Sequence, residues 1–263
     1  MRAVILAAGR GTRMADVSRG RPKCLLEFGK RTILDYQIQN LLGAGIDEIA
    51  IVVGYEKEQI VEHVAHEHLD SAARIQFLHN RLYRTTNNIY SLGRARNWAS
   101  GRRFLCLNAD VLFHPWILRP LLRASHAVTL AVDPEFREET AKVIIREGRI
   151  VALGKKITRA EASGTFANMA AFSARGSTLL FRTIEAMVRA GMVNCFFNDA
   201  ILRLAAKGTE VGYTETGALP WAEVDDARDV AYAERAVYPA LVGAHKGSRE
   251  APDGYHAASE VAS

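Results

Sequence analysis

The chain has 263 residues, 49% hydrophobic and 24% charged, which excludes a chain that is disordered throughout and suits one large domain or two small ones. Its net charge of +5 comes from scattered arginines without an aromatic-interleaved basic stretch, and this argues against a nucleic-acid-binding protein. The three cysteines lie far apart without metal-binding spacing, which favours a reducing compartment.

No charged leader precedes a long apolar segment, and every apolar run is too short to cross a bilayer. We therefore expect a cytoplasmic protein without membrane contact.

Short apolar runs alternate with helical patterns through the first half of the chain. Strands are predicted at residues 3–6, 48–55, 75–80, 103–110 and 127–133. Helices are predicted between them at residues 33–45, 56–68, 87–98 and 116–125. This alternation predicts an α/β fold with a Rossmann-like, mostly parallel sheet covered by helices on both faces.

The pattern changes after the fifth predicted strand. Residues 141–154 alternate around Glu147 and Gly148, which predicts a small β-hairpin insertion. A strand at 166–173, helices at 177–189 and 196–206, a strand at 211–216 and a helix at 225–237 follow. We expect one domain over residues 1–242 and a disordered tail over 243–263, because that last stretch is small, polar and aperiodic.

The first predicted strand leads into a glycine-rich loop, LAAGRGTRM. Gly9 and Gly11 allow backbone N–H groups to approach phosphate closely, and Arg10 and Arg13 supply charged donors. The loop lacks the third glycine of the dinucleotide-binding pattern and the GK[ST] ending of a Walker loop. Both of those common nucleotide sites are therefore excluded.

The loop pattern G-x-G-x-R-M, followed by RPKCLLEFGKRTILDYQI, resembles nucleoside-triphosphate-dependent nucleotidyltransferases of the sugar-1-phosphate type. The resemblance implies that Arg13 and Lys23 are catalytic and contact the triphosphate. It also implies that the nucleotide is bound by Leu6, Ala8, Gly9, Arg10 and Gly11.

Later segments narrow the resemblance. VVGYEKEQI, YRTTNNIYSL, LNADVLF, KVIIREGRIVALGK, FANMAAFS, FFNDAI and WAEVDD look like bacterial choline-phosphate cytidylyltransferases and related enzymes that place CMP on inositol phosphate or phosphonates. The similarity runs in order through roughly residues 1–240.

This resemblance implies further site residues. Asn88 and Ser91 would recognise the base and ribose, although helix capping also explains an asparagine at residue 87 or 88. Asp110 and Asp225 would hold Mg²⁺, since carboxylates at the carboxyl ends of parallel strands lie where such sheets bind ligands. Asp226 is predicted to cap the final helix instead.

The acceptor end is less determined by the sequence. Lys155 matches a family lysine that faces the acceptor phosphate, and Lys142 is a second candidate. Choline-specific relatives have a tryptophan near ETAKVII, where this chain has no aromatic residue. Asp199 could meet an ammonium group, and Phe196, Phe197, Tyr90 and Trp221 are available aromatic residues, although a place in a helix core is slightly favoured for Phe196 and Phe197. A phosphonate or polyol phosphate therefore competes with phosphocholine as the acceptor.

The expected activity is Mg²⁺-dependent transfer of CMP from CTP to such an acceptor, with release of pyrophosphate. The alternatives are a sugar-1-phosphate nucleotidyltransferase that uses another nucleoside triphosphate and a non-catalytic nucleotide-binding module. The hairpin and late helices could form a homodimer. The histidines of HVAHEH are predicted to lie on a solvated helix face rather than in a metal site.

Overall fold

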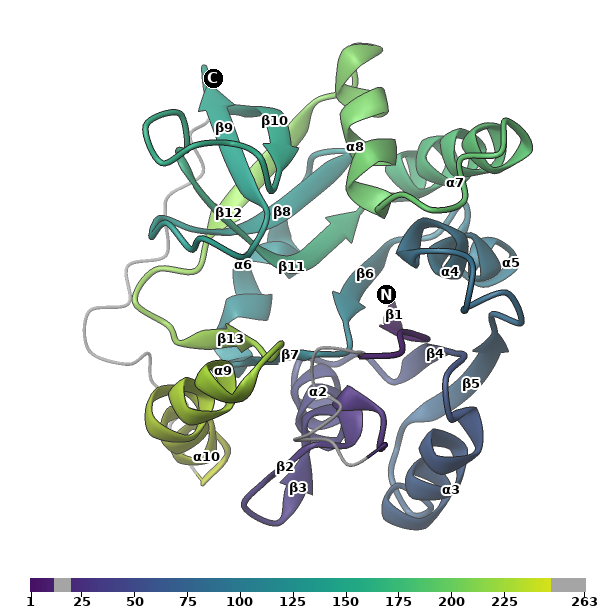
Figure 1. Ribbon diagram of the computed structural model, residues 1–263, viewed down its shortest axis with the longest axis vertical. Helices are drawn as coiled ribbons and strands as arrows, with labels where there is room; N and C mark the ends of the chain where they lie inside the picture. Colours follow the sequence, from purple (N-terminus) through teal and green to yellow (C-terminus); the bar gives the residue numbers. More distant parts are fainter. Residues whose placement is uncertain (12–19, 247–263) are drawn as a thin grey trace.

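A mixed sheet of nine strands forms the centre of the structure, a computed structural model that describes residues 1–11 and 20–246 (Figure 1). The strand order is β10-β9-β11-β6-β1-β4-β5. Strand β8 pairs with β11 and, on its other edge, with β12. These strands are β1 (Arg2–Ala7), β4 (Glu48–Val53), β5 (Arg74–His79), β6 (Phe104–Asn108), β8 (Val128–Asp133), β9 (Lys142–Arg146), β10 (Arg149–Gly154), β11 (Gly164–Phe172) and β12 (Val211–Glu215).

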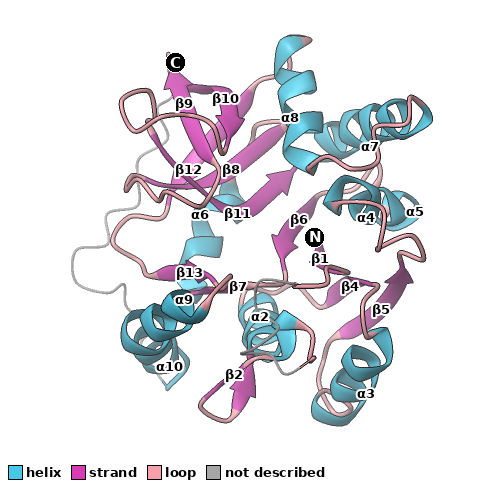
Figure 2. Cartoon of the chain, in the orientation of Figure 1, coloured by secondary structure: helices cyan, strands magenta, loops and turns pink. Residues whose placement is uncertain are grey.

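Helices and short antiparallel pairs complete the fold (Figure 2). The short strands are β2 (Glu27–Phe28) with β3 (Arg31–Thr32), and β7 (Val111–Phe113) with β13 (Trp221–Glu223). The helices are η2 (Lys23–Leu25), α2 (Ile33–Gly43), α3 (Lys57–Glu67), α4 (Asn88–Arg94), α5 (Arg96–Ala99), η3 (Pro115–Ile117), α6 (Leu118–Arg123), α7 (Ala174–Arg189), α8 (Phe197–Ala206), α9 (Ala227–Tyr232), η4 (Ala233–Val237) and α10 (Tyr238–Lys246).

The predicted α/β fold is confirmed: β6, β1, β4 and β5 are parallel neighbours, and β8 and β12 form a further parallel pair. Strand β11 runs antiparallel to β6, β8 and β9. It follows the predicted β9–β10 hairpin directly and pairs with β9, so no helical crossover is present to return it in the parallel direction.

Alternate residues of the parallel strands point to opposite faces of the sheet. Val4 and Leu6 of β1 pack with side chains of α4, α7 and α8, whereas Ala3 and Ile5 pack with α2, α3 and α6. Both faces are therefore buried, which is why these strands read as continuous apolar runs in the sequence. Cys106 of β6 is fully buried within this core.

A third apolar cluster joins α2, the β7–β13 pair and the helices near the C-terminus. Asp226 accepts hydrogen bonds from the backbone N–H groups of Arg228 and Asp229, which confirms it as the predicted helix cap. Helix α10 continues to Lys246, beyond the domain boundary predicted at 242. The rest of the predicted tail lies outside the described residues.

The prediction that the HVAHEH histidines lie on a solvated face is wrong for two of them. His63 and His68 are mostly buried and bond Asp35 of α2 at 2.9 and 2.8 Å, whereas His66 is exposed. The reason is a tertiary contact: the end of α3 lies against the first turn of α2, where Asp35 is already part of a capping box with Thr32.

Within the described parts of the chain, no helix has the length and apolar character needed to cross a membrane.

Candidate active site

The glycine-rich loop leaves the carboxyl end of β1 and borders a cavity of about 250 Å³. Gly11 has φ +59°, and a Cβ atom there would lie 2.8 Å from Cγ of Lys23. Glycine is thus required for Lys23 to lie across the loop. Arg10 is exposed, and Arg13 lies outside the described residues. The lining residues are Leu6, Ala7, Gly9, Gly11, Pro22, Lys23, Cys24, Ala109, Asp110 and Asp225.

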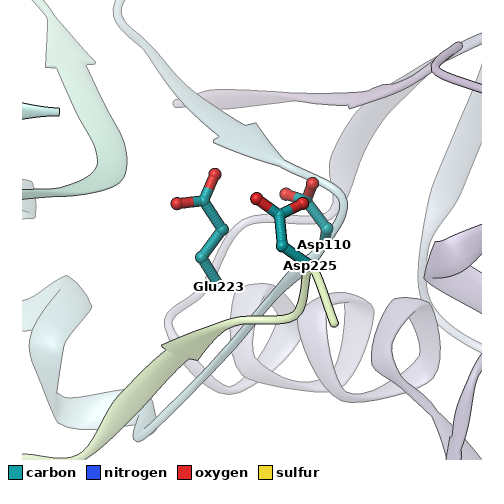
Figure 3. Close-up of side chains that lie close together, drawn as sticks. All are labelled: Asp110, Glu223 and Asp225. Carbon is teal, nitrogen blue, oxygen red and sulfur yellow. The ribbon is translucent and has the colours of Figure 1, made fainter. Parts of the chain in front are cut away.

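Two carboxylates of this lining, Asp110 and Asp225, meet a third, Glu223. Each of the three offers an oxygen, and these oxygens all lie within 4.8 Å of one another (Figure 3). The β7–β13 pair brings them together, because Glu223 pairs with Val111 and the Val224 N–H donates to the Asp110 carbonyl at 2.8 Å. Residues far apart in sequence are thereby placed in one cluster.

Glu223 was not predicted as a site residue. Burial, and the nearby charges of Asp110 and Asp225, raise its pKa to about 7, against the opposing effects of Lys155 and a hydrogen bond from Thr140. One signal in the sequence could have found it. Glu223 precedes Asp225 by two positions in an extended segment, and such residues share a side of the chain.

The donor set of this acidic cluster suits a hard divalent cation such as Mg²⁺, which prefers carboxylate oxygens. Crowded carboxylates repel one another when no cation is near them. Within the described residues, the Lys23 ammonium forms an ion pair with Asp225 of this cluster. Lys23 thus connects the glycine-rich loop to the acidic cluster.

A second cavity of about 440 Å³ opens beside the first, and Leu6, Gly9, Asp110 and Asp225 line both. It brings together most of the predicted site residues: Leu6, Ala8, Gly9, Asn88, Ser91, Asp110, Lys155, Asp199 and Asp225. Residues that were not predicted also line it, among them Asn80, Asn108, Lys156, Asn168, Asn198 and Glu223.

Helix α4 presents the predicted base-recognition residues Asn88 and Ser91 to this larger cavity. Asn87 is the cap of α4. The Asn88 carboxamide oxygen accepts from the Phe197 N–H at 2.8 Å, so the Asn88 nitrogen is the atom it can offer to a ligand. Ser91 accepts from the Asn80 side chain at 3.0 Å. Asn80, Asn88 and Ser91 thus provide neutral hydrogen-bonding groups to the cavity.

Lys155 is exposed and lines the same cavity, but Lys142 does not reach it. Lys142 is 2% exposed, and its ammonium donates to the backbone carbonyls of Glu138 and Lys155 at 2.9 and 2.6 Å. Lys142 therefore does not face the cavity, as an acceptor contact would require. Its ammonium instead holds the backbone of Lys155, whose side chain lines the cavity.

The predicted roles of the α8 residues also divide. Phe197 is fully buried, as expected for a core residue, whereas Phe196 is 45% exposed and lines the cavity. Asp199 lines the cavity too, and its carboxylate accepts from the Phe196 N–H at 3.1 Å. One carboxylate oxygen is thereby engaged with the start of α8.

Comparisons with known proteins identify the family and the fold. Residues 3–162 match the family model of the MobA-like NTP transferase domain. The chain is 30% identical over 239 residues to CMP-5'-(3-aminopropyl)phosphonate synthase of Streptomyces rubellomurinus, covering 87% of this chain and 37% of that protein. It is 28% identical over 172 residues to CTP:phosphoglutamine cytidylyltransferase of Campylobacter jejuni, covering 59% of this chain and 66% of the relative.

Solved structures match the fold over nearly the whole chain. The inositol-1-phosphate CTP transferase from T. maritima superposes with a TM-score of 0.79 at 20% identity, covering 94% of this chain and 96% of the other. The CTP:phosphocholine cytidylyltransferase of Streptococcus pneumoniae gives 0.73 at 22% identity, covering 89% and 97%. By contrast, the chain spans between about a third and two thirds of the length of the two curated relatives above.

Proposed function

The chain belongs to the MobA-like NTP transferase family, and we propose that it is a Mg²⁺-dependent cytidylyltransferase. It would transfer CMP from CTP to a small phosphorylated or phosphonylated alcohol and release pyrophosphate. The observation that carries this proposal is the acidic cluster of Asp110, Glu223 and Asp225: all three line the larger cavity, and Asp110 and Asp225 also line the loop cavity.

The two cavities suit the two substrates. Gly9, Gly11 and Lys23 surround the smaller cavity, where backbone N–H groups and an ammonium would hold the triphosphate. The predicted contact of Arg13 would add a second charge. Asn88 and Ser91, which line the larger cavity, would bind the base.

Lys155 stands at the acceptor end of the larger cavity, close enough to Glu223 to lower its pKa. It would bind the acceptor phosphate or phosphonate and align one oxygen with the α-phosphorus of CTP. That oxygen is already ionised, so no general base is needed. Mg²⁺ bound to the acidic cluster would supply charge neutralisation at the reacting phosphate, and Lys23 would neutralise the departing pyrophosphate.

Two observations support the choice of acceptor class. The cationic side chains at that end, Lys155 and Lys156, favour an anionic acceptor. Among the described residues that line the larger cavity, Tyr83 and Phe196 are the aromatic ones, too few for the aromatic faces that surround a quaternary ammonium. A phosphonate or polyol phosphate fits this lining better than phosphocholine.

The test is a matrix of CTP, UTP, GTP, ATP and dTTP against an aminoalkylphosphonate, a polyol phosphate and phosphocholine, with pyrophosphate release as the readout. We expect release with CTP and one of the first two acceptors. Release with GTP but not CTP would contradict the cytidylyl assignment. No release with any pair would support a non-catalytic nucleotide-binding module instead.

A further inference from the structure

A strained asparagine lies in the middle of β11. Asn168 has φ +57°, in the left-handed region, although β11 continues on both sides of it. The register with β8 shifts between Phe166 and Ala170, so Asn168 lies in an irregular, bulged part of the strand. Bulges redirect side chains, and non-glycine residues in this conformation gather at ligand sites.

The Asn168 side chain pairs with that of Asn108 at the end of β6. Asn108 Nδ2 donates to Asn168 Oδ1 at 3.1 Å. The other two amide atoms, Asn108 Oδ1 and Asn168 Nδ2, are buried and have no hydrogen-bond partner in the part of the chain that the structure describes. Both residues line the larger cavity. Buried polar atoms in native proteins nearly always find a partner, so this pair is incomplete without a ligand.

The chemistry of the missing partner follows from the pair itself. Two carboxamides joined by one hydrogen bond leave one carbonyl oxygen and one NH₂ group unused, whichever way each amide is turned. The pair therefore offers one acceptor and one donor close together. A single hydroxyl group can donate to the first and accept from the second, whereas a phosphate oxygen or an ammonium can satisfy one of them.

The position of the pair indicates which hydroxyl. Asn108 is the register partner of Leu6, at the start of the nucleotide loop, and it precedes Asp110 by two positions. Asn88 and Ser91 line the same cavity. In a nucleotide the ribose joins the base to the α-phosphate, so a hydroxyl-binding pair beside the loop strand and Asp110, in the cavity that also holds Asn88, suits a ribose hydroxyl.

We propose that Asn108 and Asn168 together bind a ribose hydroxyl of the nucleotide and make the site select ribonucleotides over deoxyribonucleotides. The inference rests on the proposed function, because it takes the base to lie at Asn88 and the phosphates at the glycine-rich loop.

The experiment measures binding of CTP, 2′-deoxy-CTP and 3′-deoxy-CTP to the full chain by calorimetry, with Mg²⁺ and without acceptor. We expect the wild type to prefer CTP over one of the two analogues by roughly tenfold, since the analogue leaves the amides unpaired. In Asn168→Gly we expect that preference to fall to roughly twofold, mainly through weaker CTP binding. Glycine accepts the positive φ, so this variant removes the amide while preserving the backbone.

The matched control is Glu147→Gly. Glu147 also has a positive φ, +48°, and is exposed in the β9–β10 turn, so the change relieves similar strain away from the cavity. Its CTP preference should equal that of the wild type. Should Asn168→Gly fail to fold, as judged by its melting temperature, Asn108→Ala carries the same expectation.

Full preference for CTP in a folded Asn168→Gly chain would overturn the inference. So would equal binding of all three nucleotides by the wild type, and that result leaves the proposed function standing if CTP still supports pyrophosphate release. Absence of any CTP binding by the wild type would instead contradict the proposed function itself.

Discussion

Two buried acidic sites in this protein show opposite electrostatics. Asp35 accepts hydrogen bonds from the Thr32 N–H at 2.8 Å and hydroxyl at 2.7 Å, and it also bonds His63 and His68. Although burial alone would raise the pKa of Asp35, the histidine and threonine hydrogen bonds hold it far below the usual range. This carboxylate is fully partnered by the fold.

The acidic cluster contrasts with it. Burial and neighbouring carboxylates raise the pKa of Glu223 to about 7, so the folded protein disfavours its ionised form. The comparison separates two uses of a buried carboxylate. Where hydrogen bonds complete the group, as at Asp35, it stabilises the fold. Where like charges gather, as at Glu223, the arrangement becomes favourable when a cation binds.

The largest expected effect tests the functional side of this contrast. Asp110→Asn should reduce pyrophosphate release on the order of 10³-fold, since it removes a charge that would hold Mg²⁺ at the reacting phosphate. Its melting temperature should not fall, because repulsion with Glu223 is relieved. Glu67→Gln, at an exposed residue of α3, is the matched control. Turnover within a few-fold of wild type in Asp110→Asn would contradict the metal role.

The structural side is tested by Asp35→Ala. We expect the free energy of unfolding to fall by about 3 kcal/mol, because the substitution removes the capping box of α2 and leaves His63 and His68 without their acceptor. Urea denaturation measures this loss. Asp47→Ala, at an exposed surface ion pair with Arg74, should change stability by less than about 1 kcal/mol. Equal losses of unfolding free energy in the two variants would contradict a larger structural role for Asp35 than for an exposed ion pair.

A smaller effect is expected at the contact between Lys23 and the acidic cluster. The Lys23 ammonium pairs with Asp225, so a divalent cation without nucleotide must displace it. Lys23→Met should therefore bind Mn²⁺ about tenfold more tightly than the wild type while losing turnover. Titration followed by electron paramagnetic resonance measures the affinity, and Lys30→Met in an exposed turn is the control. Weaker Mn²⁺ binding in Lys23→Met would show that the lysine does not compete.

The smallest expected effect concerns acid. Because the folded-state pKa of Asp35 is depressed, its contribution to stability is present above the unfolded-state pKa of about 3.9 and is lost as the pH falls toward the folded value. Wild type should thus lose more unfolding free energy than Asp35→Asn between pH 6 and pH 3. Parallel losses in urea titrations of the two chains would contradict this assignment.

The sequence was most informative where local pattern and function coincide. The apolar runs predicted the parallel strands, and the glycine-rich loop with Lys23 indicated where we propose that the nucleotide binds. Tertiary pairing decided the rest. Glu223 lies in the acidic cluster because β13 pairs with β7. Lys142 does not line the larger cavity, because its ammonium is held by the Lys155 carbonyl. The spacing of Glu223 and Asp225 hints that they share a side of the chain, but the sequence alone does not show the pairing with β7 or the place of Lys142.

The sequence by itself therefore determined the family, the α/β class and the residue types of a phosphate-binding loop, because these depend on short-range periodicity and contiguous motifs. The tertiary structure alone decided which carboxylates meet, which histidines complete Asp35, and that Asn108 and Asn168 form an incomplete amide pair. Those contacts join residues distant along the chain, and their register follows from how the strands and helices pack.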